Sequence, residues 1–190
     1  MPSTKHTLVA LVEDKPGVLN RVASLIRRRN FNIESIAVGH SEQPGMSRMT
    51  IVVDGATTAV EQVRKQLGKL IEVVKVSDLS DDPIVSRELA LIKVMTTSSN
   101  RSEIIQIVDI FRAKIIDVAA ESVIIEVTGD EEKIDSLCSL LRRFGIKELA
   151  RTGRIAMPRG ASGAVRLEPE EEAEDEEAHP QRVKKARPGQ

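Results

Sequence analysis

Residues 12–19 read Val-Glu-Asp-Lys-Pro-Gly-Val-Leu, where an apolar strand ends in a tight turn and a helix begins at Gly17. The first N–H groups of a helix have no partner within the helix, and its positive dipole end favours an anion. Gly17 has no side chain to block a ligand, and Pro16 lacks an N–H that would have had no partner there. Such turns are structural more often than functional. The stretch therefore predicts a strand-turn-helix first and a carboxylate or phosphate site second.

Outward from this turn, the apolar pattern predicts a strand, a helix, two strands, a helix and a strand. These elements are expected at 6–12, 18–29, 33–39, 46–54, 58–70 and 71–76. The same order then repeats, with strands at 88–95, 115–119, 122–128 and 147–155 and helices at 101–112 and 131–144. We therefore predict an α+β fold of two tandem ferredoxin-like βαββαβ units, each an antiparallel sheet with both helices on one face.

The chain divides into two units, a linker and a tail. The predicted boundaries are 1–78 for the first unit, 79–86 for a polar linker, 87–157 for the second unit and 158–190 for a charged tail. The tail is rich in charge and poor in apolar residues, which predicts disorder. A solubilising role is the simpler interpretation of the tail, and regulatory docking is the alternative. The corresponding turn of the second unit lacks Pro-Gly, so a ligand site is expected in the first unit only.

The composition argues against several classes of function. The formal net charge of −1 gives no general attraction to nucleic acid or an acidic membrane, and three Phe without Tyr or Trp provide no base-stacking platform. No stretch reaches the length of a membrane-spanning segment, and the start of the chain does not resemble a signal sequence, which predicts an unexported, cytoplasmic protein. The single cysteine, Cys138, is expected to be a core residue on a helix.

The sequence contains no recognisable catalytic or metal-binding motif. His6, His40 and His179 are far apart, and neither a nucleophile elbow, a P-loop nor a dinucleotide-binding glycine motif occurs. Asp130 lies at a turn before a helix and is expected to cap that helix. We therefore predict no catalytic residue, no metal site and no enzyme activity for this chain by itself.

Several motifs, in order along the chain, carry a resemblance to a known family. They are Asp-Lys-Pro-Gly-Val-Leu at 14–19, Asn-Phe-Asn-Ile-Glu-Ser at 30–35 and Ser-Arg-Met-Thr-Ile at 47–51, with further matches at 66–70, 86–94 and 111–118. Together they resemble the small regulatory subunit of acetolactate synthase, also called acetohydroxyacid synthase. The resemblance implies an N-terminal ACT domain, which is an amino-acid-sensing module, followed by a C-terminal regulatory domain.

The same resemblance implies partners and cofactors. The large catalytic subunit of this family uses thiamine diphosphate, Mg²⁺ and often FAD to join two pyruvates into acetolactate with loss of CO₂, and the small subunit binds none of these cofactors. The small subunit forms a homodimer through its ACT domains, activates the large subunit, and brings feedback inhibition by L-valine to branched-chain amino-acid synthesis. A free-standing ACT-type sensor that regulates another enzyme is the alternative. A small ferredoxin-like hydrolase would need a convergent Arg and Asn, for which there is no signature.

By resemblance, valine binds between two ACT domains, at the strand-to-helix turn of one and near the second strand of the other. The backbone N–H groups of Gly17 and Val18 are expected to bind its carboxylate, and Asn32 to hydrogen-bond the zwitterion. Ile33 and the Val18 side chain are expected to form an apolar wall. For Asp14, two interpretations remain: it caps the first helix and also contacts the ligand ammonium, or it only caps the helix.

Overall fold

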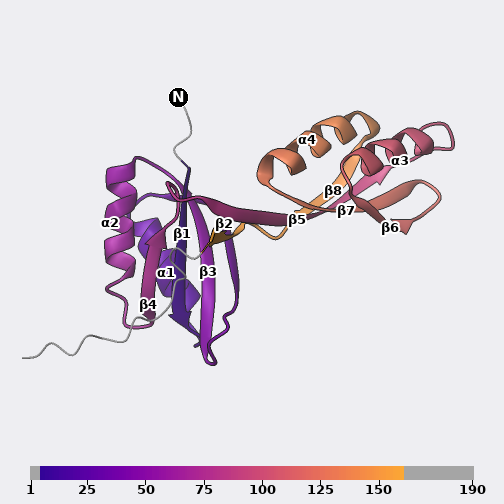
Figure 1. Ribbon diagram of the computed structural model, residues 1–190. Helices are drawn as coiled ribbons and strands as arrows, with labels where there is room; N and C mark the ends of the chain where they lie inside the picture. The colour runs from indigo at the N-terminus through magenta and orange to yellow at the C-terminus, as the bar shows by residue number, and fades with distance from the viewer. Residues whose placement is uncertain (1–4, 161–190) are drawn as a thin grey trace, which may run out of the picture.

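The computed structural model describes residues 5–160 as two βαββαβ units joined by a long strand (Figure 1). The N-terminal unit contains β1 (Lys5–Glu13), α1 (Val18–Arg28), β2 (Asn32–His40), β3 (Met46–Asp54), α2 (Thr57–Leu67) and β4 (Val73–Asp78). The C-terminal unit contains β5 (Ile84–Met95), α3 (Arg101–Ile110), β6 (Lys114–Val118), β7 (Ser122–Gly129), α4 (Glu131–Leu141), the 3₁₀ helix η1 (Arg142–Phe144) and β8 (Ile146–Arg151), after which comes β9 (Ile155–Pro158). The predicted α+β architecture of two ferredoxin-like units is confirmed. Most of the predicted tail lies outside the described residues.

The N-terminal sheet has the strand order β2-β3-β1-β4, so β2 and β4 are its edges. Successive side chains of a strand point to opposite faces. Leu8, Ala10 and Val12 of β1 therefore pack beneath α1 and α2, whereas Val9 and Leu11 face the other side. Each helix contributes a stripe of buried apolar residues to the same core. This core lies between the sheet and both helices.

A two-stranded ribbon covers part of the second face of this sheet. The first four residues of β5 pair with β9, and Ile84 and Ala156 of the ribbon pack against Val9 and Leu11. The ribbon ties the end of the described chain to the N-terminal unit. The local sequence pattern does not predict this ribbon, because the ribbon is buried against a sheet whose residues are distant in the sequence.

The ribbon corrects two predictions about the chain. The predicted linker at 79–86 includes residues 84–86, which belong to β5. The predicted strand at 147–155 is two strands, because the chain leaves β8 after Arg151 and Gly153 adopts a φ of 83° before β9 begins. A positive φ of this size breaks a strand and favours glycine.

The C-terminal sheet has the strand order β6-β7-β5-β8, with β9 paired to the first part of β5. Its core gathers on the face that α3 and α4 cover, and it includes Ile92, Ile125 and Leu137. Asp130 caps α4, since its carboxylate accepts a 2.9 Å hydrogen bond from the Lys133 N–H. Cys138 is 6% exposed in this core. The predicted cap and the predicted core cysteine are both confirmed.

Charged side chains from both units meet at a joint between them. The Lys5 ammonium lies 2.5 Å from Glu34 of β2 and 2.6 Å from Glu131 at the start of α4. Arg154 also pairs with Glu131, and its backbone N–H donates a 2.9 Å hydrogen bond to the Ser35 hydroxyl. Glu34 is the extra residue of a β-bulge where the register of β2 against β3 shifts. These contacts hold the start of α4 against the edge strand β2.

Glu88 of β5 is buried at this joint, with 7% of its surface exposed. Burial raises the pKa of its carboxyl group above the usual value, and the attraction of Arg151 offsets this effect only in part. Because the pKa is higher in the folded than in the unfolded protein, ionisation of Glu88 favours unfolding. This destabilisation is absent below the unfolded value of about 4.5 and grows as the pH rises above it.

The Glu88→Gln variant is therefore expected to have a higher Tm than the wild type at pH 7 and the same Tm at pH 3. Gln has the same shape as Glu and carries no charge to bury. Differential scanning calorimetry over a pH series measures the difference. Glu148→Gln, which changes an exposed carboxylate of the same unit, serves as the control. A lower Tm for Glu88→Gln at pH 7 would contradict this account.

Candidate functional site

The turn after β1 faces open space. Gly17 adopts a φ of 90°, in the left-handed region that favours glycine, and α1 begins directly after it. A Cβ atom at this position would meet no other heavy atom within 4 Å. Within residues 5–160 no side chain caps α1, and the Val18 N–H makes only a long bond of 3.4 Å to the Lys15 carbonyl. The turn therefore offers weakly engaged N–H groups at a positive helix end, which suits a small anion.

Asp14 lies beside this turn and does not cap α1. Its carboxylate is 3.3 Å from Nδ1 of His40, and its backbone N–H donates to the Gly45 carbonyl at 2.8 Å. Both contacts turn it toward the β2–β3 hairpin, which is the physical reason that the predicted cap is wrong. The Asp14 side chain remains 47% exposed, so its carboxylate is accessible to a ligand.

A positive charge also lies at the turn. The Lys15 ammonium is 2.8 Å from the Glu13 carboxylate, and this hydrogen bond raises the pKa of Lys15 above its usual value. The turn thus combines backbone donors with side chains of both charges. A zwitterion finds partners for both of its ends in such surroundings.

Val18 and Ile33, which were predicted to form an apolar wall of the ligand site, differ in their burial. The Val18 side chain is 4% exposed within the core of the N-terminal unit, so only its backbone remains at the turn. This corrects the prediction that the Val18 side chain lines a pocket, because position 18 belongs to the buried stripe of α1. Ile33 is half-buried on β2 and packs against the same core.

Asn32 lies at the opposite end of the sheet from the turn. It is exposed as the first residue of β2 and is paired with Asp54, which is also opposite Lys5 at the start of β1. His40, the last residue of β2, lies beside Asp14. Nine residues of strand span roughly 27 Å, so one chain does not bring Asn32 to its own Gly17 turn.

The corresponding turn of the C-terminal unit is closed by its own side chains. The Thr97 N–H donates to Oδ1 of Asn100 at 2.7 Å, and the hydroxyls of Thr97 and Ser99 are 2.9 Å apart. This turn therefore lacks the open donors of the Gly17 turn.

The sequence alone did not single out several functional candidates. His40 and the charged residues of the joint carried no motif, because hairpin pairing and the packing of the two units bring them together. Within residues 5–160, no three His, Cys, Asp or Glu side chains gather as a metal site. No helix in this described range is long and apolar enough to cross a membrane.

The fold and the open turn define the class of this protein. The N-terminal unit has the βαββαβ order, an uncapped start of its first helix and an exposed edge strand. Its residues 8–75 match the family described as AHAS small subunit-like ACT domain. The N-terminal unit is thus an ACT domain. Residues 87–160 match the family described as small subunit of acetolactate synthase. The chain belongs to the family of acetolactate synthase small subunits.

Individual relatives agree with this assignment. The chain is 58% identical over 156 residues to the "Probable acetolactate synthase small subunit" of Archaeoglobus fulgidus, covering 82% of this chain and 98% of that protein. It is 53% identical over 158 residues to the acetolactate synthase small subunit of Mycolicibacterium smegmatis, covering 83% and 93%. The crystal structure of the small subunit from Thermotoga maritima matches with a TM-score of 0.76 and 48% identity, covering 82% and 98%.

Proposed function

We propose that this chain binds L-valine between the ACT domains of two copies, and that it both activates and feedback-inhibits a large catalytic acetolactate synthase subunit. The observation that carries the proposal is the position of Gly17 and Asn32 at opposite ends of one sheet. A site that needs both residues must be completed by a second chain. Because β2 is an edge strand, a second chain can pair with it.

Pairing of two copies about a two-fold axis through the middle of β2 would produce this arrangement. Among the described strands, β2 pairs only with β3, so its outer edge has free backbone groups. Antiparallel pairing of two β2 edges, centred on Ile36, sets Asn32 of one chain opposite His40 of the other. Because His40 lies beside Asp14, Asn32 of the second chain then reaches the Gly17 turn. Such a contact uses the same surface on both chains, as two-fold interfaces do.

The chemistry of the completed site fits an apolar α-amino acid. The N–H groups at Gly17 and Val18 bind the carboxylate, and Asn32 of the partner copy donates to it or accepts from the ammonium. Asp14 pairs with the ammonium, and Ile33 contributes apolar surface. One methylene changes binding in such a pocket by about 1–3 kcal/mol, so leucine and isoleucine are weaker ligands rather than excluded ones.

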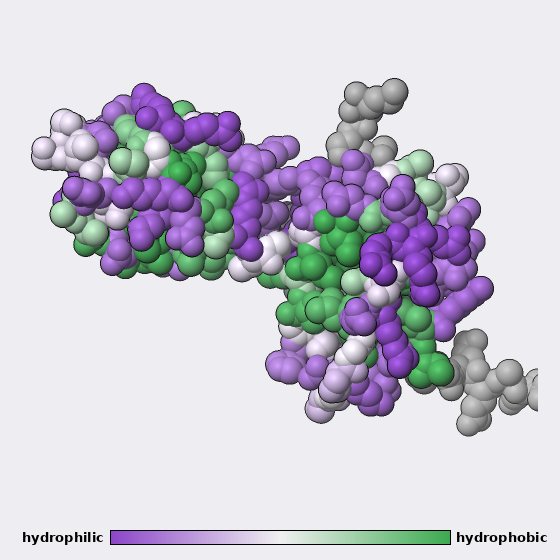
Figure 2. All heavy atoms as spheres, turned by 180° about the vertical axis from the view of Figure 1, so that it is seen from behind, coloured by the Kyte–Doolittle hydropathy of each residue, from purple (hydrophilic) through white to green (hydrophobic). Residues whose placement is uncertain are grey.

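The large subunit would contact the groove beside β9, next to the proposed β2–β2 contact. Val38, Ile155 and Met157 are 47%, 59% and 63% exposed and border a shallow groove of about 230 Å³ between β2 and β9. Apolar side chains gather on the surface of the N-terminal unit in Figure 2. Exposed apolar surface of this kind is typical of protein contacts. In this proposal, thiamine diphosphate, Mg²⁺ and FAD belong to the large subunit, where the condensation of pyruvate takes place.

Calorimetric titration of L-valine into the full chain tests the proposal. At the interface site we expect saturable binding of one L-valine per chain, no binding of D-valine, and inhibition by L-valine after reconstitution with the large subunit. Absence of binding by a folded, dimeric chain would refute the valine site. Co-purification with a different enzyme would favour the alternative of a free-standing amino-acid sensor.

A further inference from the structure

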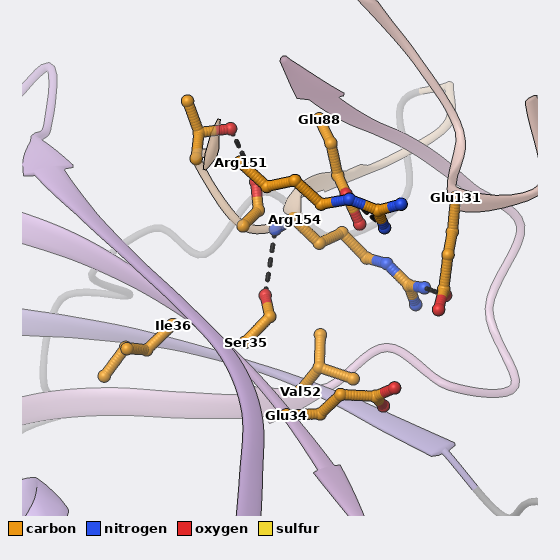
Figure 3. A pocket seen from close by; sticks show the side chains of 10 residues that line it. Glu34, Ser35, Ile36, Val52, Glu88, Glu131, Arg151 and Arg154 are labelled. Carbon is orange, nitrogen blue, oxygen red and sulfur yellow. Dashed lines mark hydrogen bonds and ion pairs between the residues drawn. The ribbon is translucent and has the colours of Figure 1, made fainter. Parts of the chain in front are cut away.

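A cavity of about 270 Å³ lies at the joint, with walls from both units (Figure 3). Side chains of β2 and β3 form one wall, and β5, the start of α4 and the segment between β8 and β9 form the other. The ion pairs of Lys5, Glu131 and Arg154 brace this opening. Its volume lies just below the usual range for small-molecule sites, about 300–1,000 Å³, so only a small ligand fits.

Glu88 is the most informative residue of this cavity. Its side chain is 8% exposed, it lines the cavity, and its nearest cationic group is Nη1 of Arg151 at 3.9 Å. This distance is too long for a hydrogen bond. No hydrogen bond to the Glu88 carboxylate is found within residues 5–160. The side chain is thus mostly buried, whereas its carboxylate lines the cavity without a close donor and is available to a ligand there.

Arg151 is held in place from its other side. Its Nη2 donates a 2.5 Å hydrogen bond to Asp135 and also approaches the Cys138 sulfur at 3.9 Å. Nη1 is thereby aimed at Glu88, and Figure 3 shows the two side chains pointing toward one another. The cavity thus presents a carboxylate and a guanidinium group side by side, each with capacity to bind a further charged group.

An α-amino acid is complementary to this pair of charges. Its ammonium and carboxylate groups are held about 3 Å apart by the Cα atom, close to the separation of Glu88 and Arg151. The ammonium would donate to Glu88 while the carboxylate accepts from Arg151. Ile36 and Val52 also line the cavity and provide contact for a small apolar side chain.

Other small ligands fit less well. A phosphate ion would face the carboxylates of Glu34, Glu88 and Glu131, which line the same cavity. A metal ion would need a cluster of ligands that residues 5–160 do not form. A simple amine would leave Nη1 of Arg151 without an acceptor. The observed set of charges therefore favours a zwitterion.

We propose that the joint cavity is a second ligand site, distinct from the ACT interface, in which Glu88 and Arg151 together bind the charged groups of a small apolar α-amino acid. Its walls lie within one chain, so this site does not depend on a second copy. A ligand there contacts both units and therefore resists changes in the angle between them.

L-valine titrated into the full chain carrying Asn32→Ala is the test. This background removes a contact of the proposed interface site and leaves the cavity intact. Methyl NMR signals of Ile36 and Val52 report binding, and we expect them to shift saturably. Isobutylamine and isobutyrate, which each keep only one of the two charges, are expected to cause no saturable shift.

Glu88→Gln in the same background is expected to weaken this binding about tenfold or more, because a charged hydrogen bond is lost. Glu148→Gln, which does not line the cavity, should bind as tightly as the background protein. Absence of shifts up to the solubility limit of L-valine, or unchanged binding by Glu88→Gln, would overturn the proposal. If the interface site does not bind L-valine but the cavity does, the methyl shifts of Ile36 and Val52 are still observed. The two proposals are therefore tested separately.

Discussion

The Gly17→Asp variant is expected to lose L-valine binding at the interface between the ACT domains, and with it valine inhibition. An aspartate there directs a negative charge and a side chain into the space that the ligand carboxylate would occupy, at the positive end of α1. The φ of 90° also strains any L-residue, so Gly160→Asp is a matched control. Gly160 has a φ of 69° and equally open surroundings, and it follows β9 rather than β1. Calorimetry on both variants, with Tm as a measure of folding, makes the comparison.

Mixing two inactive variants tests whether two chains share the site. Asn32→Ala and Gly17→Asp are each expected to bind L-valine poorly at the interface when alone, since each damages both interface sites of a symmetric dimer. A dimer containing one chain of each kind has one intact site, with Gly17 from the first chain and Asn32 from the second. After chains are exchanged at equal concentration, the mixture should recover about a quarter of the wild-type binding capacity at the interface sites, which is read out by valine inhibition. A mixture that stays inactive after exchange would contradict a site shared between two chains.

The Ile51→Ala variant is expected to destabilise the N-terminal unit by about 2–5 kcal/mol. Ile51 is 0% exposed in β3, where it faces the core between the sheet and both helices. Truncation removes buried apolar surface and leaves a cavity that neighbouring side chains fill only in part. Denaturant titration followed by NMR signals of β3 measures the free energy of unfolding of this unit.

Ile71→Ala provides the matched control for this core substitution. Ile71 is 92% exposed, so removal of the same atoms changes stability by about 0.5 kcal/mol or less. Equal losses in the two variants would contradict the location of the core. Unchanged stability of the C-terminal unit in both variants is expected, because that unit has its own core.

Most of the fold was predictable because its signals are local. The apolar period of each helix and the alternation along each strand are set by residues a few positions apart. The predicted ends of helices and strands were less accurate where tertiary contacts determine them. For instance, α2 ends at Leu67 and β4 begins at Val73, whereas the pattern predicted a helix to 70 and a strand from 71. Ile71 looked like a strand residue because it is apolar, yet nothing covers it.

By itself, the sequence determined the order of elements, the open glycine turn, the cap of α4 and the membership of a regulatory family. Each depends on neighbouring residues or on ordered motifs. Only the tertiary structure decided that Asn32 lies far from its own turn and that β9 returns to the N-terminal unit. It also brought Lys5 to Glu131, 126 positions away, and left Glu88 buried beside a cavity. Such contacts depend on how two separately folded cores pack, and no local pattern encodes that packing.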